Sequence, residues 1–204
     1  MKAIDPSAYS QLASALIGET LRLVPLTNDH VDSLHEAFRD DDLWHWQGRQ
    51  PRHLDETAQW VEAALVEARA GREAAFVIET LEGQLAGSTR YLDLRWQDAA
   101  VEIGWTMVFA PFRRTRVNTE AKYLLLSRAF DQIGCARVQL KTDSNNARSR
   151  AAIQRIGASY EGILRQHKRR ADGSLRDTAF FSILSSEWPQ VKTRLRSQLL
   201  RTDS

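Results

Sequence analysis

A polar turn at residues 113–118 (Arg-Arg-Thr-Arg-Val-Asn) joins a strand-like segment to a helix-like segment. The first amides of a helix have no partners within the helix, and the helix dipole is positive at that end, so such a turn suits an anion. Its three arginines add positive charge. A diphosphate fits this turn better than a metal ion, because no His, Cys or Asp cluster here has the spacing of metal ligands. An ordinary strand-to-helix turn with solvated arginines would have the same residues. The residue types and the helix dipole alone therefore leave both an anion-binding turn and an ordinary turn open.

A second polar stretch, Asp-Ser-Asn-Asn-Ala-Arg-Ser at residues 143–149, follows another strand-like segment and leads into a helical pattern that ends at Gly157. Asn146 is placed to cap that helix or to hydrogen-bond a ligand, and one side chain can do both. Ser149 is either an ordinary residue of the first helical turn or a hydroxyl directed at a reacting group.

Together the two stretches resemble the GNAT (N-acetyltransferase) superfamily, which joins a cofactor-binding turn and helix to an Asn-x-x-Ser helix that ends in Gly. The run Val-Glu-Ile-Gly-Trp at 101–105, the segment Arg-Thr-Arg-Val-Asn-Thr-Glu-Ala-Lys at 114–122 and the late Glu-Gly and Asp-Gly-x-x-Arg-Asp elements look like its Rim-type branch. That branch includes acetyltransferases of ribosomal-protein N-termini. The resemblance covers about residues 19–188 and implies acetyl-CoA as the cosubstrate.

The resemblance implies a cofactor site along the strand, the turn and the second polar stretch. The strand backbone would pair with the pantetheine arm, the turn would hold the pyrophosphate, and Asn146 would hydrogen-bond the arm. Arg114 and Arg116 replace the usual glycines, and their amides can still face a phosphate if both residues keep right-handed dihedral angles. The expected cofactor-binding residues are Met107, Val108, Phe109, Arg113, Arg114, Thr115, Arg116, Val117, Asn118, Thr119, Asn145 and Asn146.

The implied reaction is the attack of a neutral amine on a thioester. It needs a proton acceptor for the amine, donors for the tetrahedral oxyanion and a proton for the leaving thiolate. Many relatives take that proton from a tyrosine, but the matching residue here is Ile153, and we expect Ser149, which matches the serine of the Rim-type branch, to be the acid. Glu102 is the expected base, directly or through water, unless it faces outward on an alternating strand. His167 is a weaker rival in a basic run.

Aromatic residues mark the expected acceptor side. The loop between the first two helices shapes the acceptor pocket in the family, and its indoles suit a peptide or a flat substrate, although they would equally pin the loop to the core. Arg90 would bind an acceptor carboxylate or pair with a surface acid. The expected substrate-binding residues are Trp44, Trp46, Arg90 and Trp105. Cys135 follows a helix stop, which favours buried packing over nucleophilic catalysis.

Alternating and helical patterns predict the elements that must position these residues. Strands are expected at residues 19–26, 74–80, 85–93, 100–109, 136–142, 160–167 and 177–184. Helices are expected at about 28–38, 55–71, 119–134, 147–156 and 186–204, after an N-terminal extension at 1–18. Antiparallel strands followed by a β-α-β crossover predict an α+β fold. We expect one domain over residues 1–204, with a mixed, mostly antiparallel twisted sheet of about seven strands and flanking helices.

Bulk composition limits the possible functions. The 204 residues suit one compact domain, and a net charge of +2 gives no electrostatic footprint for duplex DNA or an anionic membrane. The N-terminal apolar stretch is short and interrupted by polar residues, so we expect neither a signal sequence nor a membrane span. A single cysteine leaves no intrachain disulfide and favours a reducing compartment. We therefore expect a cytoplasmic protein without a bound metal.

Three functions remain compatible with the sequence. The leading hypothesis is an acetyl-CoA-dependent N-acetyltransferase that acts by direct transfer in a ternary complex, with a protein N-terminus or a small amine as acceptor. The missing tyrosine and glycines suggest a catalytically degenerate CoA-binding module as the alternative. An RNA-associated protein would use the basic runs at 165–170 and 192–201, although no RNA-binding module is recognised. The C-terminal helix would cover the sheet or a partner subunit, so a homodimer stays open.

Overall fold

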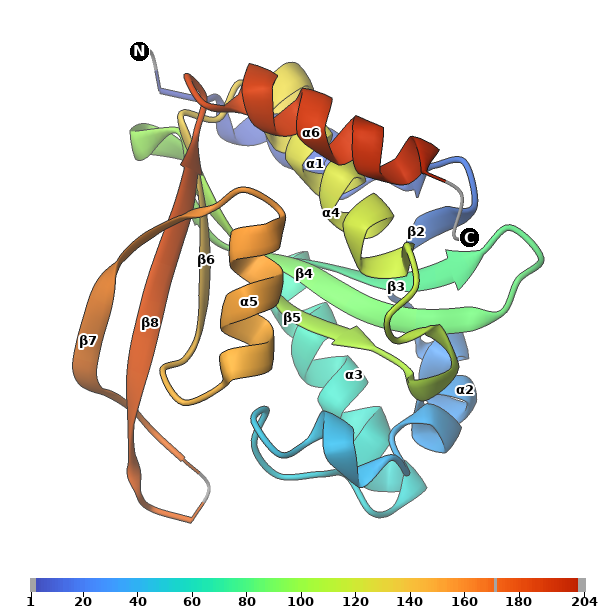
Figure 1. Cartoon of the computed structure of the whole chain (residues 1–204). Coiled ribbons are helices and arrows are strands. Elements are labelled where there is room, and N and C mark those ends of the chain that lie inside the picture. The colour runs from blue at the N-terminus through green and yellow to red at the C-terminus, as the bar shows by residue number, and fades with distance from the viewer. Residues whose placement is uncertain (1–2, 171, 202–204) are drawn as a thin grey trace.

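An eight-stranded sheet forms the centre of the computed structural model, which describes residues 3–170 and 172–201 (Figure 1). The strand order is β1-β2-β3-β4-β5-β6-β8-β7, and every neighbouring pair is antiparallel except β5 and β6. The predicted α+β class with a mixed, mostly antiparallel sheet is confirmed. The strands are β1 (Leu16–Ile17), β2 (Leu21–Pro25), β3 (Ala74–Thr80), β4 (Leu85–Arg95), β5 (Ala100–Val108), β6 (Arg137–Asp143), β7 (Ser159–Arg169) and β8 (Leu175–Leu184). The α-helices are α1 (Tyr9–Leu12), α2 (Val31–Ala37), α3 (Leu54–Arg69), α4 (Val117–Ser127), α5 (Ala147–Arg155) and α6 (Trp188–Leu200).

Helices cover both faces of the sheet. Successive residues of a strand point to opposite faces, and apolar side chains on both faces need to be buried. α4 and α6 lie on one face, and α2 and α3 lie on the other (Figure 1). Phe76 and Ile78 of β3 belong to a large hydrophobic cluster that includes residues of α4, whereas Val77 belongs to a smaller cluster that includes residues of α3. Burial on both faces explains why β3 is an almost continuous apolar run.

β5 and β6 pair over only three positions, from Ala100 opposite Arg137 to Glu102 opposite Gln139, and then separate (Figure 1). Trp105 has a positive φ of 48°, and the ladder between β4 and β5 shifts register near this residue. The irregularity changes which face of the sheet the later residues of β5 reach. Ile103 packs in the cluster of α4, whereas Met107 packs in the cluster of α3, although both positions have odd numbers.

The segment expected as an N-terminal extension packs into the core. Leu12 of α1 is fully buried, and the hydroxyl of Tyr9 lies 2.8 Å from the carbonyl oxygen of Ala68 and 2.9 Å from that of Glu73. The two-residue strand β1 then pairs with β2 and raises the strand count from seven to eight. α1 and β1 are too short to show a hydrophobic period, so the sequence pattern does not predict them. No helix in the described parts of the chain is long and apolar enough to cross a membrane.

Candidate functional site

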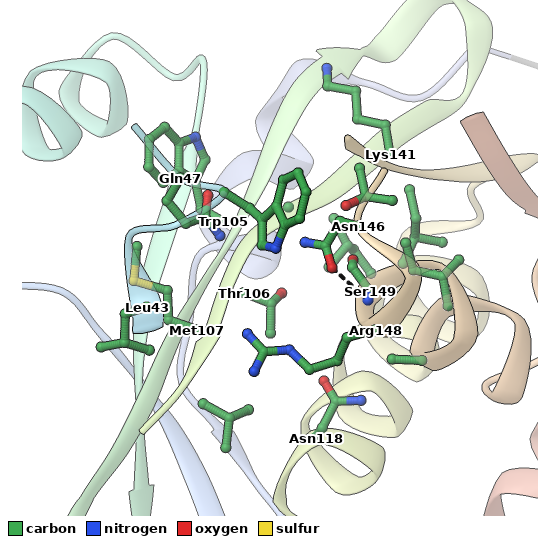
Figure 2. A pocket seen from close by; sticks show the side chains of 18 of the residues that line it. Leu43, Gln47, Trp105, Thr106, Met107, Asn118, Lys141, Asn146, Arg148 and Ser149 are labelled. Atoms are coloured by element: carbon green, nitrogen blue, oxygen red, sulfur yellow. Dashed lines mark hydrogen bonds between the residues drawn. The ribbon is translucent and has the colours of Figure 1, made fainter. Parts of the chain in front are cut away.

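A cleft of about 1610 Å³ opens where β5 and β6 separate. Its walls come from β5, the turn before α4, the start of α5, the β7–β8 hairpin and the loop between α2 and α3. In Figure 2, Trp105 and Thr106 of β5 lie on one side of the cleft, and Asn146 and Ser149 at the start of α5 lie on the other. The cleft therefore brings together the two polar stretches that the sequence singled out.

The turn before α4 carries a row of backbone donors along the cleft. Five of its amides donate a hydrogen bond to no other group within residues 3–170 and 172–201. The dipole of α4 is positive at this end, so the turn provides both the donors and the potential that an anion requires. These amides belong to Arg114, Thr115, Arg116, Asn118 and Thr119, all of which line the cleft.

Arg113 and Arg116 hold the turn in place through carboxylates. Arg113 Nη2 pairs with Asp40 in the loop after α2. Arg116 Nη2 lies 3.1 Å from Glu19 Oε2, and Arg116 Nε lies 3.4 Å from the buried carboxylate of Glu120. Both guanidiniums are thus already neutralised by acids of this chain.

Arg114 differs from these two arginines. Its side chain is exposed, and no carboxylate of the described residues lies within 4.0 Å of it. Its φ of 63° lies in the left-handed region, whereas Arg116 has the right-handed values φ −69° and ψ −12°. The right-handed dihedral angles that were expected at both residues are therefore present at Arg116 and absent at Arg114. Arg114 adopts the backbone conformation that glycine takes most readily, and it adds a cation.

Asn146 caps α5, and its Oδ1 accepts a hydrogen bond of 3.0 Å from the amide of Ser149 (Figure 2). Its side-chain nitrogen makes no hydrogen bond to another described group, so it remains available to a ligand in the cleft. The Ser149 hydroxyl also lines the cleft and has no partner in that part of the chain. Asn145 lies outside this cleft, in a smaller pocket that includes Trp46.

Glu102 lines the cleft, and only 1% of its surface is exposed. Lys141 Nζ lies 2.6 Å from its Oε2, and Gln139 Nε2 donates to the same oxygen at 3.0 Å. Its Oε1 accepts no hydrogen bond from the residues that the structure describes. A Cβ added at Gly104 would lie 3.2 Å from Oε1, so the glycine leaves this oxygen uncovered. One oxygen of the carboxylate is therefore fixed and the other is open.

His167, the rival base, is not among the residues that line the cleft. Its ring packs against Phe180 at 5.3 Å between centroids, and its Nδ1 is buried without a partner among the described groups. Burial lowers the pKa of His167, and the positive charges of Lys141, Lys168 and Arg176 lower it further.

Arg90 lies behind the wall of the cleft and does not line it. The carbon at the centre of its guanidinium lies 4.5 Å from the ring centroid of Trp60 and 5.1 Å from that of Trp105, and Nη1 is 3.0 Å from Glu73. Arg90 thus supports Trp105 from behind by cation–π contact. The indoles that line the cleft are Trp44, Trp46 and Trp105.

Lys122 of α4 ends the segment 114–122 that resembles the family, and it lines the cleft although the sequence predicts no functional role for it. Its side chain is buried, and Nζ donates to the hydroxyl of Thr106, which lies 2.8 Å from the hydroxyl of Thr89. No carboxylate of the described chain lies within 4.0 Å of Nζ. Burial lowers the pKa of Lys122 to about 7. A helical lysine is normally solvated, so only the packing of α4 against β5 reveals this amine.

Most of the expected site residues meet in the cleft. Those that line it are Trp44, Trp46, Glu102, Trp105, Met107, Val108, Arg113, Arg114, Thr115, Arg116, Asn118, Thr119, Asn146 and Ser149. Phe109 and Val117 are buried in the hydrophobic clusters instead. Cys135 is also buried, and burial raises the pKa of its thiol to about 12. No group of three or more His, Cys, Asp or Glu residues in the described chain is arranged to hold a metal ion.

Residues 20–159 match the family model described as an acetyltransferase (GNAT) domain. A GCN5-related N-acetyltransferase from Brucella melitensis is 30% identical over 94% of this chain and 89% of that chain, with a TM-score of 0.87. RimJ from Mycobacterium smegmatis, solved in complex with CoA-disulfide, is 21% identical over 91% of this chain and 95% of that chain, with a TM-score of 0.79. The microcin C7 self immunity acetyltransferase MccE, solved with acetyl-CoA and AMP, is 16% identical over 82% of this chain and 93% of that chain, with a TM-score of 0.72. These last two likenesses concern the fold alone. No curated protein matches the sequence significantly.

Proposed function

Because this chain belongs to the GNAT acetyltransferase family, we propose that its cleft holds acetyl-CoA and a primary amine together and passes the acetyl group directly between them. The chain is an N-acetyltransferase, and acetyl-CoA is its acetyl donor. One observation carries the proposal of direct transfer. The free amides at the start of α4 lie in the same cavity as the hydroxyl of Ser149 and the carboxylate of Glu102.

In this proposal the pyrophosphate of acetyl-CoA accepts hydrogen bonds from the amides of residues 114–119, with Arg114 as the uncommitted cation. Beyond Glu102, the edge of β5 that faces β6 has no strand partner. Its backbone groups near Met107 are therefore available to the amide groups of the pantetheine arm. The side-chain nitrogen of Asn146 supplies a further donor on the opposite side of the cleft.

The acetyl transfer requires two proton movements, and the cleft offers a group for each. The nitrogen of the neutral amine forms a bond to the acetyl carbon, and as this bond forms the nitrogen loses a proton to Glu102 Oε1, directly or through one water, while Lys141 and Gln139 hold Oε2. The bond from the acetyl carbon to sulfur then breaks. Ser149 donates a proton to the departing thiolate and regains one through water from Glu102, which took it from the amine. Its hydroxyl is suited to this role because no described residue uses it.

The acceptor side of the cleft has an aromatic lining. Trp46 and Trp105 provide flat apolar surfaces for the amine-bearing molecule, and Arg90 holds Trp105 from behind. Trp44 is 6% exposed and its Nε1 donates to the carbonyl oxygen of Phe38, so it mainly holds the loop to the core. The Rim-type motifs at 101–105 and 172–177 support a protein N-terminus as the acceptor. A small primary amine fits the same chemistry.

The test combines a binding measurement with a turnover measurement. The full chain is titrated with CoA by calorimetry and then incubated with acetyl-CoA and a panel of peptides and small amines, while thiol release and the mass of the amine product are followed. We expect CoA binding and thiol release that depends on the amine. CoA binding without any acetylated product would favour a degenerate binding module, and the absence of CoA binding would overturn the proposed cofactor site.

A further inference from the structure

Lys168 and Arg176 occupy directly opposite positions on the antiparallel strands β7 and β8. Both line the cleft, on the wall that also includes Lys141 of β6. Like charges in opposite positions of neighbouring strands repel each other. Lys168 is exposed at its solvent side, yet partial desolvation lowers its pKa, and the charges of Lys141 and Arg176 lower it further. This wall, which we call the hairpin wall (Lys141, Lys168, Arg170 and Arg176), therefore concentrates positive charge.

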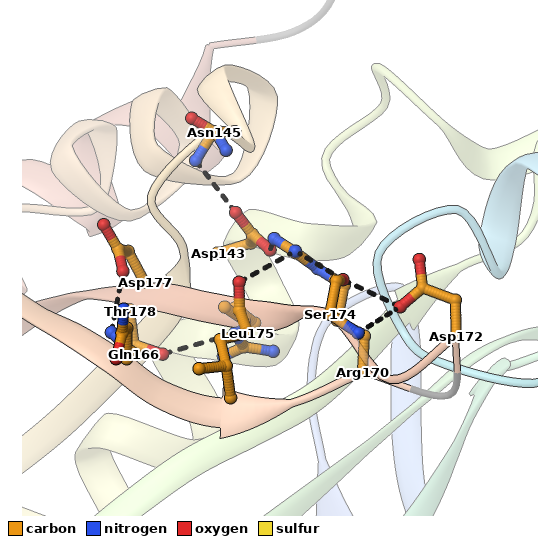
Figure 3. A network of polar contacts seen from close by, with 10 residues as sticks. Asp143, Asn145, Gln166, Arg170, Asp172, Ser174, Leu175, Asp177 and Thr178 are labelled. Carbon is orange, nitrogen blue, oxygen red and sulfur yellow. Dashed lines mark hydrogen bonds and ion pairs between the residues drawn. The ribbon is translucent and has the colours of Figure 1, made fainter.

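The buried acids of the hairpin wall are already paired with other cations. Glu102 accepts from Lys141 at 2.6 Å. Asp143 is 2% exposed and pairs with Arg170 near the tip of the hairpin (Figure 3). Each of these carboxylates is thus neutralised by one cation of the wall.

Lys168 and Arg176 have no such neutralising partner. In the described chain, no carboxylate lies within 4.0 Å of either side chain. Arg176 Nε donates only to the hydroxyl of Thr178, at 3.2 Å. The other acids near the hairpin have partners of their own: Asp172 accepts from the amide and the hydroxyl of Ser174 at the tip of the hairpin (Figure 3), Asp177 accepts from the amide of Gln166, and Glu73 pairs with Arg90. Two adjacent cations in the cleft are therefore left without an ion-pair partner among the described residues.

We infer that the acceptor is an amine that also carries a carboxylate or phosphate group, and that this anion binds between Lys168 and Arg176. The inference rests on the proposed acetyltransferase function. An anion in this position relieves the repulsion across the hairpin and accepts hydrogen bonds from a guanidinium and an ammonium group. It also places the amine near Glu102, because Lys141 connects Glu102 to the same wall.

The pyrophosphate of acetyl-CoA has separate donors in the proposed complex. The start of α4 and the β7–β8 hairpin lie on opposite sides of α5 (Figure 1). The free amides of residues 114–119 serve the cosubstrate on one side, so the hairpin wall is left for the acceptor.

The first measurement compares acceptors that differ only in charge, at saturating acetyl-CoA. One pair is O-phosphoethanolamine and ethanolamine, and the other is the peptide amide Ser-Asp-Ala and its neutral counterpart Ser-Asn-Ala. We expect kcat/KM to be at least about tenfold higher for the anionic member of one pair, mainly through KM, because a hydrogen-bonded charge pair is gained. The pair that shows the preference identifies the source of the anion as a small metabolite or an acidic peptide. Equal kcat/KM values within both pairs would overturn the inference.

The second measurement removes the two cations in the double variant Lys168→Gln/Arg176→Gln. We expect kcat/KM for the preferred anionic acceptor to fall about tenfold or more, while the neutral member of the pair and the KM for acetyl-CoA change less than about twofold. Arg165→Gln is the matched control, because Arg165 is exposed on the same strand and does not line the cleft. A preference that survives in the double variant, or a parallel rise in the KM for acetyl-CoA, would overturn the inference.

A failure of the proposed function gives a different result. If acetyl-CoA binds but no amine is acetylated, direct transfer is wrong, and the anion site is then tested by titrating O-phosphoethanolamine and the Ser-Asp-Ala peptide into the CoA-bound protein. Binding of either molecule that the double variant loses and Arg165→Gln keeps supports the anion site. The absence of such binding refutes it.

Discussion

Lys141 Nζ lies 2.6 Å from one oxygen of Glu102, while the second oxygen, beside Gly104, accepts no hydrogen bond from the described residues. The ion pair holds the carboxylate in a fixed orientation in the wall of the cleft. The absence of a side chain at Gly104 keeps the second oxygen open. A proton acceptor for an incoming amine requires this combination of a held group and an accessible lone pair.

Replacing this carboxylate by an amide removes the proton acceptor and keeps the shape. We expect Glu102→Gln to lower kcat about 100-fold with little change in the KM for acetyl-CoA, because general base catalysis contributes a factor of this order. Steady-state kinetics with the best amine of the panel checks this. The control is Glu161→Gln, since Glu161 pairs with Arg137 and does not line the cleft. An unchanged kcat in Glu102→Gln would exclude the base role.

Removing the lysine instead leaves a buried carboxylate without its cation. We expect Lys141→Met to lower the free energy of unfolding by about 3 kcal/mol. Without the lysine, the desolvation penalty of the buried Glu102 carboxylate is no longer offset by an opposite charge. The double variant Lys141→Met/Glu102→Gln should recover part of the loss. Urea unfolding of the two single variants and the double variant measures the coupling. Equal losses in Lys141→Met and in the double variant would show that the ion pair does not matter for stability.

Ser149 is expected to act on the leaving group and not on cofactor affinity. We expect Ser149→Ala to lower kcat about 10- to 100-fold, because the departing thiolate loses its proton donor, while the KM for acetyl-CoA stays nearly constant. The change should alter the pH profile of kcat. Ser144→Ala is the matched control, since Ser144 belongs to the same polar stretch but does not line the cleft. Full turnover with the wild-type pH profile in Ser149→Ala would refute the acid role.

Hydrophobic pattern predicted the long elements well, because each long strand or helix buries one or both of its faces. β3 was predicted with the bounds that the structure has, and α5 was predicted to within one residue. The prediction failed for α1 and β1, which are too short to show a period. The pattern also predicts the start of α4 two residues late, because the polar turn is expected to extend through Asn118.

The positions of site residues can be predicted where a local motif sets them. They cannot be predicted where contacts between segments far apart in the chain determine where the side chain lies. The amides before α4 and the cap at Asn146 follow from strand–turn–helix order alone. The pairing of Arg113 with Asp40 and the stacking of Arg90 on Trp60 depend on contacts between segments far apart in the chain. The positive φ at Trp105 changes the face of the later β5 residues, and no glycine at that position signals it.

Arg114 and Arg116 offer a matched pair of glycine substitutions in the cofactor turn. We expect Arg114→Gly to raise the free energy of unfolding by about 0.5–1 kcal/mol, because Arg114 has a φ of 63° that costs an L-residue more than glycine. Arg116→Gly should lower it, because Arg116 is right-handed and pairs with Glu120. Urea midpoints of both variants give the test. The same sign of change in both would mean that backbone conformation does not govern their stability.

Lys122 makes the stability of the fold depend on pH in a predictable direction. Its amine is buried, contacts the hydroxyl of Thr106, and has a pKa lowered by burial from 10.5 to about 7. Between these two values the unfolded chain binds a proton that the folded chain does not, so the free energy of unfolding rises with pH across this window. Below pH 7 the folded chain must hold a charged, buried amine with no carboxylate of the described chain beside it, so the whole desolvation cost of that charge is subtracted from the free energy of unfolding.

Lys122→Met removes this titration and keeps an unbranched side chain of similar length. We expect the variant to be more stable than the wild type near pH 7, and we expect its advantage to shrink by about 1.4 kcal/mol per pH unit as the pH rises toward 10. Urea unfolding of both proteins at several pH values between 7 and 10 measures the difference and cancels the titration of all other groups that the two proteins share. A difference that stays constant over this range would show that Lys122 keeps its proton in the folded protein, and that the cleft solvates the ammonium group.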